Sequence, residues 1–133
     1  MRIKVKMIER TNIAGTSPYE PVIGFSRAVR IGSEVHVSGT GPVGEDEAEA
    51  AQQTEQCLTL IAVALKQAGS SIEYVYRTRI YLVRAGDWEI VGRIHGKFFS
   101  ITRPAATMVV VAALLNPSWR VEIEADASIP DAP

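Results

Sequence analysis

The sequence predicts an α+β protein with a single sheet and two helices packed on one of its faces. Two segments, residues 47–68 and 87–100, carry apolar residues at helical spacing. Three strand-like segments precede the first of them, one lies between them, and two follow. The order β-β-β-α-β-α-β-β and the length of 133 residues favour one domain that spans residues 1–133.

The N-terminal part is expected to form strands and a loop. Residues 2–9 alternate charged and apolar side chains, as a half-exposed strand does. Residues 11–23 contain one glycine and two prolines and are expected to be an irregular loop. Residues 25–31 and 34–38 flank a Gly-Ser pair, a pattern typical of a β-hairpin.

The remaining elements follow from apolar spacing and from stop signals. In the first predicted helix Leu58, Ile61 and Leu65 recur at helical spacing, and Gly69 marks its end. Asp87 is placed to cap the second helix. Apolar, β-branched and aromatic residues predict three further strands, at residues 74–83, 105–115 and 119–128.

The composition argues against several classes of function. The formal net charge of −1 and the lack of a basic cluster disfavour binding to nucleic acid. No apolar run reaches the roughly 20 residues of a membrane span, and the N-terminus lacks a signal-peptide pattern. The single cysteine, Cys57, fits a reducing compartment, so we expect a cytoplasmic protein. We expect no metal and no cofactor, because the histidines and the cysteine lack ligand spacing and no phosphate-binding motif occurs.

The apolar run Met108–Leu115 predicts self-association. A strand that is apolar at nearly every position needs a cover on both of its faces. The two helices cover one face of the predicted sheet. A second copy of the chain is the expected cover for the other face, which predicts a symmetric homo-oligomer.

Several short motifs resemble the Rid family, also called YjgF. Gly24–Val29 resembles the family's Gly-Pro-Tyr-Ser-Gln-Ala-Val stretch, and Val37-Ser38-Gly39, Phe98-Phe99 and Val121–Ala127 match further family motifs. Their joint order covers roughly Phe25 to Ala127. The resemblance implies a chorismate-mutase-like subunit and a homotrimer with a central barrel and clefts between neighbouring subunits. The best-known members hydrolyse reactive enamines and imines.

The resemblance also implies which residues form the cleft. The expected ligand-binding residues are Phe25, Ser38, Gly39, Ala106 and Met108, and the expected catalytic residue is Glu122. Phe25 stands at the position of a cleft tyrosine. Ala106 stands where the deaminating members carry their substrate-binding arginine, and Met108 stands at a neighbouring small or cysteine position. Gly92 replaces an asparagine that helps in those members.

The absence of the arginine changes the expected ligand. A guanidinium grips a carboxylate through two charge-assisted hydrogen bonds, and Ala106 offers none. An unpaired carboxylate in a narrow cleft keeps its desolvation cost, so a simple 2-imino acid is expected to bind poorly. With Ala106 and Met108 as an apolar floor, the expected small-molecule ligand is neutral or partly aromatic.

The charged strand residues leave alternatives open. Arg77 and Arg79 share one face of a predicted strand. Glu122 and Glu124 share one face of another, so a structural layer of ion pairs is one expectation. A different expectation is that Arg79 or Arg103 replaces the missing arginine in the cleft. Glu122 either orients a water or accepts a proton, or it pairs with an arginine.

The other candidate groups are expected to be structural. Arg27 follows the cleft position Phe25, and strand alternation is expected to point it away from the cleft. His36 is expected on the surface of a strand, and His95 is expected to be packed or to lie in an interface. Cys57 lies in the first predicted helix and is expected to be a buried, inert thiol.

The leading functional hypothesis is a Rid-like homotrimer whose inter-subunit cleft binds or hydrolyses a small metabolite other than a simple 2-imino acid. One alternative is an enamine or imine deaminase that uses a different arginine. Another is a ligand-binding or regulatory protein without catalysis. Ribonuclease activity, which is attributed to some relatives, is disfavoured because the sequence offers no basic surface and no acid–base pair.

Overall fold

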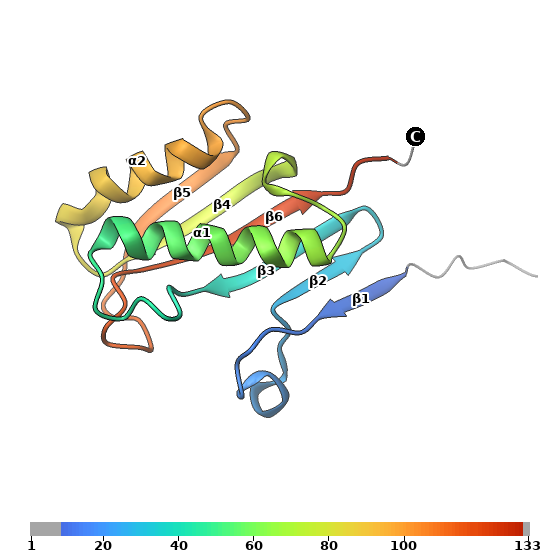
Figure 1. Cartoon of the computed structure of the whole chain (residues 1–133), viewed down its shortest axis with the longest axis horizontal. Helices are drawn as coiled ribbons and strands as arrows, with labels where there is room; N and C mark the ends of the chain where they lie inside the picture. Colours follow the sequence, from blue (N-terminus) through green and yellow to red (C-terminus); the bar gives the residue numbers. More distant parts are fainter. Residues whose placement is uncertain (1–8, 132–133) are drawn as a thin grey trace, which may run out of the picture.

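A six-stranded mixed sheet carries both long helices on one face, as Figure 1 shows. The computed structural model describes residues 9–131. The strands are β1 (Arg10–Ile13), β2 (Ala28–Ile31), β3 (Glu34–Thr40), β4 (Val75–Leu82), β5 (Ala105–Val110) and β6 (Val121–Ser128), and the helices are α1 (Ala50–Gln67) and α2 (Trp88–Phe99). Three short helical turns are η1 (Glu20–Gly24), η2 (Ile72–Tyr74) and η3 (Ala85–Asp87). The predicted α+β fold is confirmed.

The strand order β1-β2-β3-β6-β4-β5 places β1 and β5 at opposite edges of the sheet. β4 pairs antiparallel with β6 and parallel with β5. The parallel pair arises because α2 carries the chain back across the sheet between β4 and β5, as a β-α-β connection must. The residues expected in the cleft are therefore distributed over both halves of the sheet.

The observed boundaries differ from the predicted ones where tertiary contacts decide them. α1 begins at Ala50 rather than at residue 47, because the preceding residues form a turn. β5 ends at Val110 rather than at residue 115, since the chain leaves the sheet after the amide of Val111 has bonded to Leu82. β1 overlaps the first residues of the predicted loop at 11–23, and the predicted strand at residues 2–9 lies outside the described residues except for Glu9.

The core lies between the sheet and the helices. In β6 the alternate residues 121, 123, 125 and 127 are fully buried, and the residues between them face the other side of the sheet. Large buried side chains of the core include Leu58, Ile61 and Leu65 of α1, Ile80 and Leu82 of β4, and Val121 and Ile123 of β6. The helix-facing side of the sheet is thus apolar, as the alternation in the sequence indicates.

The opposite face of the sheet carries charges. Arg79 Nη1 lies 3.2 Å from Oδ2 of Asp126, and Arg79 Nε lies 3.9 Å from Oε1 of Glu124. The predicted ion-pair layer is therefore present only in part: Arg79 belongs to it, whereas Arg77 donates its Nη2 to Thr107 Oγ1 at 3.3 Å and forms no salt bridge within residues 9–131. Its acidic members are Glu124 and Asp126, whereas Glu122 has no salt-bridge partner among residues 9–131.

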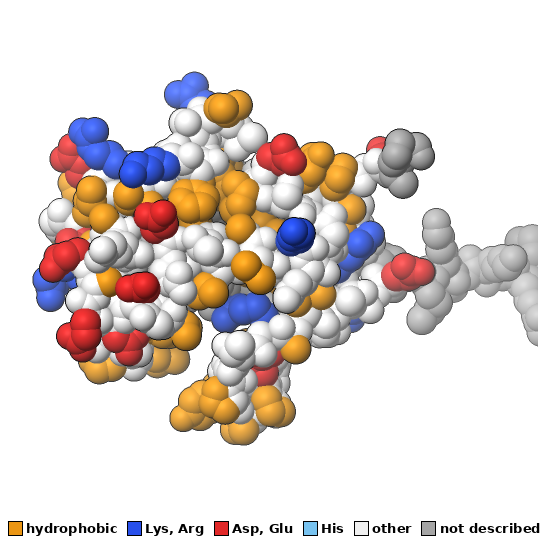
Figure 2. All heavy atoms as spheres, in the orientation of Figure 1, with side chains coloured by type: hydrophobic (Ala, Val, Ile, Leu, Met, Phe, Trp, Pro, Cys, Tyr) orange, Lys and Arg blue, Asp and Glu red, His pale blue; other side chains and the backbone are white. Residues whose placement is uncertain are grey.

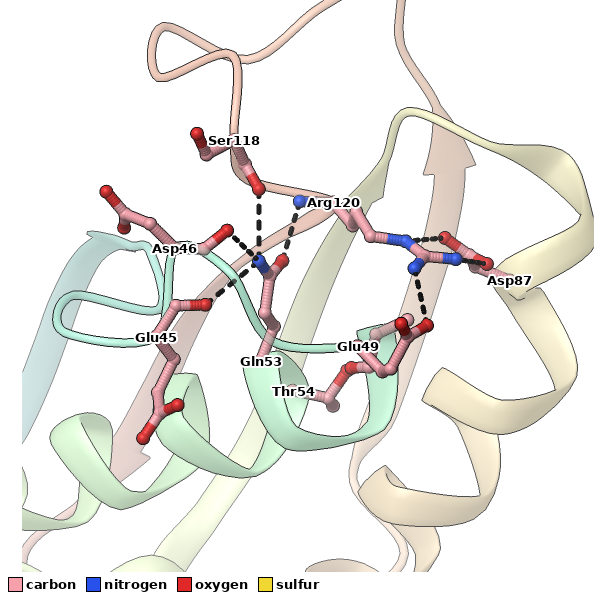
Figure 3. A network of polar contacts seen from close by, with 9 residues as sticks. Glu45, Asp46, Glu49, Gln53, Thr54, Asp87, Ser118 and Arg120 are labelled. Atoms are coloured by element: carbon pink, nitrogen blue, oxygen red, sulfur yellow. Dashed lines mark hydrogen bonds and ion pairs between the residues drawn. The ribbon is translucent and has the colours of Figure 1, made fainter.

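A buried glutamine fixes the loop that leads into β6 (Figure 3). Gln53 of α1 donates its side-chain amide to the carbonyl oxygens of Glu45, at 3.1 Å, and Ser118, at 3.0 Å. Its carbonyl oxygen accepts the backbone N–H of Arg120 at 2.7 Å. The segment 111–120 is thereby tied to the start of α1.

Asp87 extends this network instead of capping α2 with its side chain. No side-chain capping bond forms at the start of α2. The Asp87 carboxylate accepts two hydrogen bonds from the Arg120 guanidinium, at 3.0 and 2.7 Å, and Glu49 accepts a third at 3.0 Å. A bidentate pair of this kind fixes orientation as well as distance, so it aligns α2 with the start of β6.

Candidate functional site

A cavity of about 620 Å³ opens between the η1 region and the segment before β6. Its apolar and aromatic lining consists of Tyr19, Ile23, Phe25, Leu115, Pro117 and Trp119. In Figure 2 the η1 region projects from the molecule as a lobe with apolar side chains at its tip, and a basic side chain lies in the notch beside it. Exposed Tyr19, Val22 and Ile23 belong to this lobe.

One wall of the cavity is held in place by Trp119. Its indole N–H donates to Oδ1 of Asp46 at 3.1 Å. Its ring packs directly over Gly41, where an added Cβ would collide with the ring carbons. Together with the Gln53 network, these contacts fix the indole plane before any ligand is bound.

Two of the expected cleft residues, Phe25 and Gly39, line this cavity. Ser38 lies next to them and its hydroxyl donates to the carbonyl of Ser26 at 2.6 Å. Glu122 lies against Gly39, since a Cβ built on Gly39 would come within 2.7 Å of Glu122 Oε2. Phe25, Ser38, Gly39 and Glu122 thus come together in a single protomer.

The Glu122 carboxyl is half-buried. Burial raises its pKa, the positive charge of Arg27 opposes that rise, and the negative charge of Glu124 adds to it. Glu122 also borders a small cavity of about 240 Å³, and Leu115 lines both this cavity and the larger one. A carboxyl with a raised pKa next to a ligand-sized space is suited to exchanging protons.

The side chain of Arg27 lies on a different side from the one predicted from the sequence. It was expected to point away from the cleft, yet it lines the cavity together with Phe25. The physical reason is that residues two apart in an extended chain face the same side, so Phe25 and Arg27 share a face. Its Nη2 donates to the carbonyl oxygen of Gly39. Burial lowers the pKa of its guanidinium, and the charges of Glu20 and Glu122 oppose that change.

Ala106 and Met108 lie elsewhere in the protomer. They belong to the edge strand β5, where they pair with Thr78 and Ile80 and face the helices. The Met108 methyl group would be 3.8 Å from a Cβ built on Gly92 of α2. Ala106, Met108 and Gly92 therefore gather at one edge of the sheet, while Phe25 and Glu122 lie in the other part. Only a second copy could bring the two groups together.

The two arginines expected as replacements do not reach the cavity of the protomer. Arg79 is engaged by Glu124 and Asp126 on the opposite face of the sheet. Arg103 is exposed in the turn between α2 and β5, where its φ of 53° is in the left-handed region. Arg27 is the basic residue that the structure places beside Phe25 and Gly39.

Cys57, His95 and His36 lie where the sequence predicts them. Cys57 is fully buried, and burial raises the pKa of its thiol. His95 Nε2 lies 2.9 Å from Thr78 Oγ1, its ring is 4.6 Å from that of Phe99, and burial lowers its pKa. His36 is exposed and its Nδ1 lies 2.8 Å from Oδ1 of Asp126.

Two kinds of feature are absent from residues 9–131. No three side chains of His, Cys, Asp or Glu converge as they would around a metal ion. No helix is both long enough and apolar enough to cross a lipid bilayer.

Known proteins identify the family of this fold. The family model described as "Endoribonuclease L-PSP" matches residues 15–129. The chain belongs to the YjgF, or Rid, family. A crystal structure of a YjgF-family member from Mycobacterium tuberculosis is 44% identical, covers 91% of this chain and 100% of that one, and superposes with a TM-score of 0.85.

Curated relatives of this Rid protein differ in what is known of them. An uncharacterized protein from Streptomyces coelicolor is 35% identical over 115 residues, which are 84% of this chain and 86% of the relative. A protein from Acinetobacter baylyi named 3-aminoacrylate deaminase is 30% identical over 120 residues, 86% of this chain and 93% of the relative. The family thus contains a named deaminase alongside uncharacterized members.

Proposed function

We propose that this Rid protein hydrolyses the C=N bond of a small metabolite in a cleft between two copies, and that 2-imino acids with a short side chain, such as 2-iminopropanoate, are poor substrates. The single observation behind this is Glu122, a half-buried carboxyl with a raised pKa that lies against Gly39, a residue of the wall of the cavity of about 620 Å³. The name of the Acinetobacter baylyi relative, a 3-aminoacrylate deaminase, supports the reaction class. An enamine enters the same reaction after it tautomerises to the imine.

Glu122 is the group that handles protons in this reaction. Its carboxylate takes a proton from a water while the water oxygen bonds to the imine carbon and the C=N electron pair moves to nitrogen. The carboxyl then returns this proton to the nitrogen, which gives a carbinolamine. In the second half of the reaction the carboxylate takes the hydroxyl proton of the carbinolamine and passes it to the amino nitrogen, so that the C–N bond breaks and ammonia leaves as the carbonyl forms. A raised pKa suits both steps, because an acid–base group works best when its pKa is near the operating pH.

The second wall of the cleft comes from another copy. Ala106 and Met108 occupy an edge strand that ends far from Phe25 within one protomer. The trimer implied by the Rid resemblance would set this edge against the Phe25 cavity of a neighbour. Ala106 then contributes a methyl group where deaminating members carry a guanidinium, so a short substrate that depends on this contact binds weakly.

The test uses imines made in place by an amino-acid oxidase. Alanine gives 2-iminopropanoate, and phenylalanine gives an imine whose ring suits the cavity between Phe25 and Trp119. The steady-state level of each imine is followed by its ultraviolet absorbance, with and without the protein. We expect the protein to shorten the lifetime of the aromatic imine at least about tenfold more than that of 2-iminopropanoate.

The variant Glu122→Gln should reduce the acceleration by about 100-fold, the contribution typical of an acid–base group. Glu55→Gln, an equal change of charge at an exposed position of α1, should leave it unaltered. Wild-type rates in Glu122→Gln would contradict the proposed role of the carboxyl. Fast hydrolysis of 2-iminopropanoate would contradict the substrate preference, and no acceleration of any imine would favour a protein that binds without catalysis.

A further inference from the structure

We infer that Arg27 holds the anionic end of the ligand, so that the ligand is a carboxylate with an aromatic or apolar body. This role rests on the proposed function, since it concerns the same cleft, and it specifies the class of substrate. It differs from the neutral ligand that the loss of the arginine at position 106 suggests from sequence. Arg27 lies in the cavity wall beside Phe25 and Trp119.

Arg27 is the only charged side chain among the described residues that line the cavity. Its guanidinium stays protonated at neutral pH, as arginine does throughout proteins. The surrounding lining is mostly apolar, so the charge is poorly solvated and an anion beside it interacts more strongly than it would in water. A poorly solvated guanidinium is stabilised most by a ligand of opposite charge, so an anionic group is the expected partner of Arg27.

Only some of the guanidinium N–H groups of Arg27 have a hydrogen-bond acceptor within residues 9–131. Nη2 donates to the carbonyl of Gly39, whereas Nε is buried without an acceptor in the part of the chain that the structure describes. The carboxylate of Glu20 is already engaged by the amide of Gly15, at 3.0 and 3.1 Å. Glu122 acts on Arg27 through its charge, without a salt bridge. Nε is too buried to meet a ligand, whereas Nη1 makes no hydrogen bond within residues 9–131 and can donate to a carboxylate in the cavity.

The rest of the lining selects the body of the ligand. The rings of Phe25 and Trp119 and the side chain of Leu115 surround the space next to the guanidinium. Trp119 is held by Asp46 and lies over Gly41, so this wall needs no rearrangement. A volume of about 620 Å³ is within the usual range of small-molecule sites and accommodates an aryl group together with its acid.

Arg27 also borders a second cavity, of about 350 Å³, on the α1 side of the molecule. Leu60 and Val63 of α1 contribute to its lining. The first cavity is the more suitable one, because Gly39 lines it and Glu122 lies directly against Gly39. A carboxylate there is held next to the group that exchanges protons.

The experiment compares two probes of the same shape and different charge, phenylacetate and phenylacetamide. Each is titrated into the full-length ¹⁵N-labelled protein, and binding is followed by NMR. The chain has two tryptophans, so the indole N–H signals of Trp119 in the cavity wall and of exposed Trp88 on α2 report separately. We expect phenylacetate to bind at least about tenfold more tightly than the amide and to shift the signal of Trp119 alone.

Variants at Arg27 separate charge from shape. Arg27→Gln should weaken the binding of phenylacetate at least about tenfold and leave the affinity for phenylacetamide unchanged. Arg27→Lys should restore part of the difference in affinity between the two probes. Glutamine is the residue at this place in the family stretch that Gly24–Val29 resembles, so the fold is expected to accept it. Arg93→Gln, at an arginine that is 72% exposed on α2, should change neither affinity.

The outcomes distinguish this inference from the proposed function. Equal affinities for the two probes, or shifts at the backbone amides of Leu60 and Val63 with an unmoved Trp119 signal, would overturn the role of Arg27. Glu122→Gln should still bind phenylacetate. If binding depends on Arg27 but no imine is hydrolysed faster, the ligand class stands and the proposed catalysis fails. If imine hydrolysis depends on Glu122 but the two probes bind equally well, the proposed catalysis stands and the inferred role of Arg27 fails.

Discussion

At the scale of single residues, Glu122 lowers the stability of the fold when it is ionised. Burial raises its pKa, so the folded state prefers the protonated form more than the unfolded state does. The stabilisation of the fold by the protonated Glu122 carboxyl is fully present below the ordinary glutamate pKa of 4.5. It is lost as the pH rises through the raised pKa of Glu122 in the folded state. A residue kept in such a position despite this cost is a typical feature of functional sites.

The variant Glu122→Gln should therefore unfold at a higher temperature than the wild type at pH 8. At pH 4 the difference should be much smaller, because the wild-type carboxyl is then mostly protonated in both states. Thermal unfolding followed by circular dichroism at the two pH values measures this effect. Exposed Glu55→Gln serves as the control, and a lower midpoint for Glu122→Gln at pH 8 would contradict the assignment.

The site was predictable from sequence where its residues lie in short motifs. Phe25, Ser38 and Gly39 were expected in the cleft, and they lie together in the structure. The prediction that Arg27 points away from the cleft is wrong, because Phe25 is extended and the residue two positions further along faces the same way. The role of Trp119 in the cavity wall was not predictable, because it depends on how the segment 111–120 folds back.

At the scale of elements, the start of α1 is decided by contacts distant in sequence. The apolar spacing of Leu58, Ile61 and Leu65 predicts the helix and its buried side correctly. Nothing local explains why fully buried Gln53 lies on that side. Its partners belong to the loop before α1 and to the segment before β6. Local patterns predict elements well and their ends poorly for this reason.

Replacing Gln53 with alanine should destabilise the protein by about 2–4 kcal/mol, because it removes a fully buried side chain and leaves three part-buried backbone groups without its hydrogen bonds. The adjacent exposed position gives a matched control, and Gln52→Ala should change stability by no more than about 0.5 kcal/mol. Urea denaturation measures both. Equal midpoints for the two variants would show that the network in Figure 3 contributes little to stability.

At the scale of the whole molecule, a single protomer leaves much apolar surface uncovered. Val109 of β5 is 42% exposed and Leu115 is completely exposed. Both lie in the run whose composition predicts a cover on each face, and the helices supply only one. The homotrimer remains a prediction, since it concerns contacts between copies.

The variant Val109→Asp should convert the assembly into monomers, because it buries a charge in the expected interface. Val63→Asp places the same charge at a similarly exposed valine of α1 and should leave the assembly intact. Size-exclusion chromatography with light scattering gives the mass of each. A wild-type protein that is monomeric at all concentrations would contradict the prediction.

The separation of Ala106 from Glu122 within the protomer has a consequence for divergence. Ala106 is an exposed side chain on an edge strand, whereas Glu122 is held in the interior of the sheet by its neighbours β3 and β4. Mutations at one position are therefore not transmitted through shared packing to the other. A lineage can lose or gain an anchor at position 106 by a single codon change while the carboxyl keeps its surroundings, which allows related chains to acquire new ligands without rebuilding the fold.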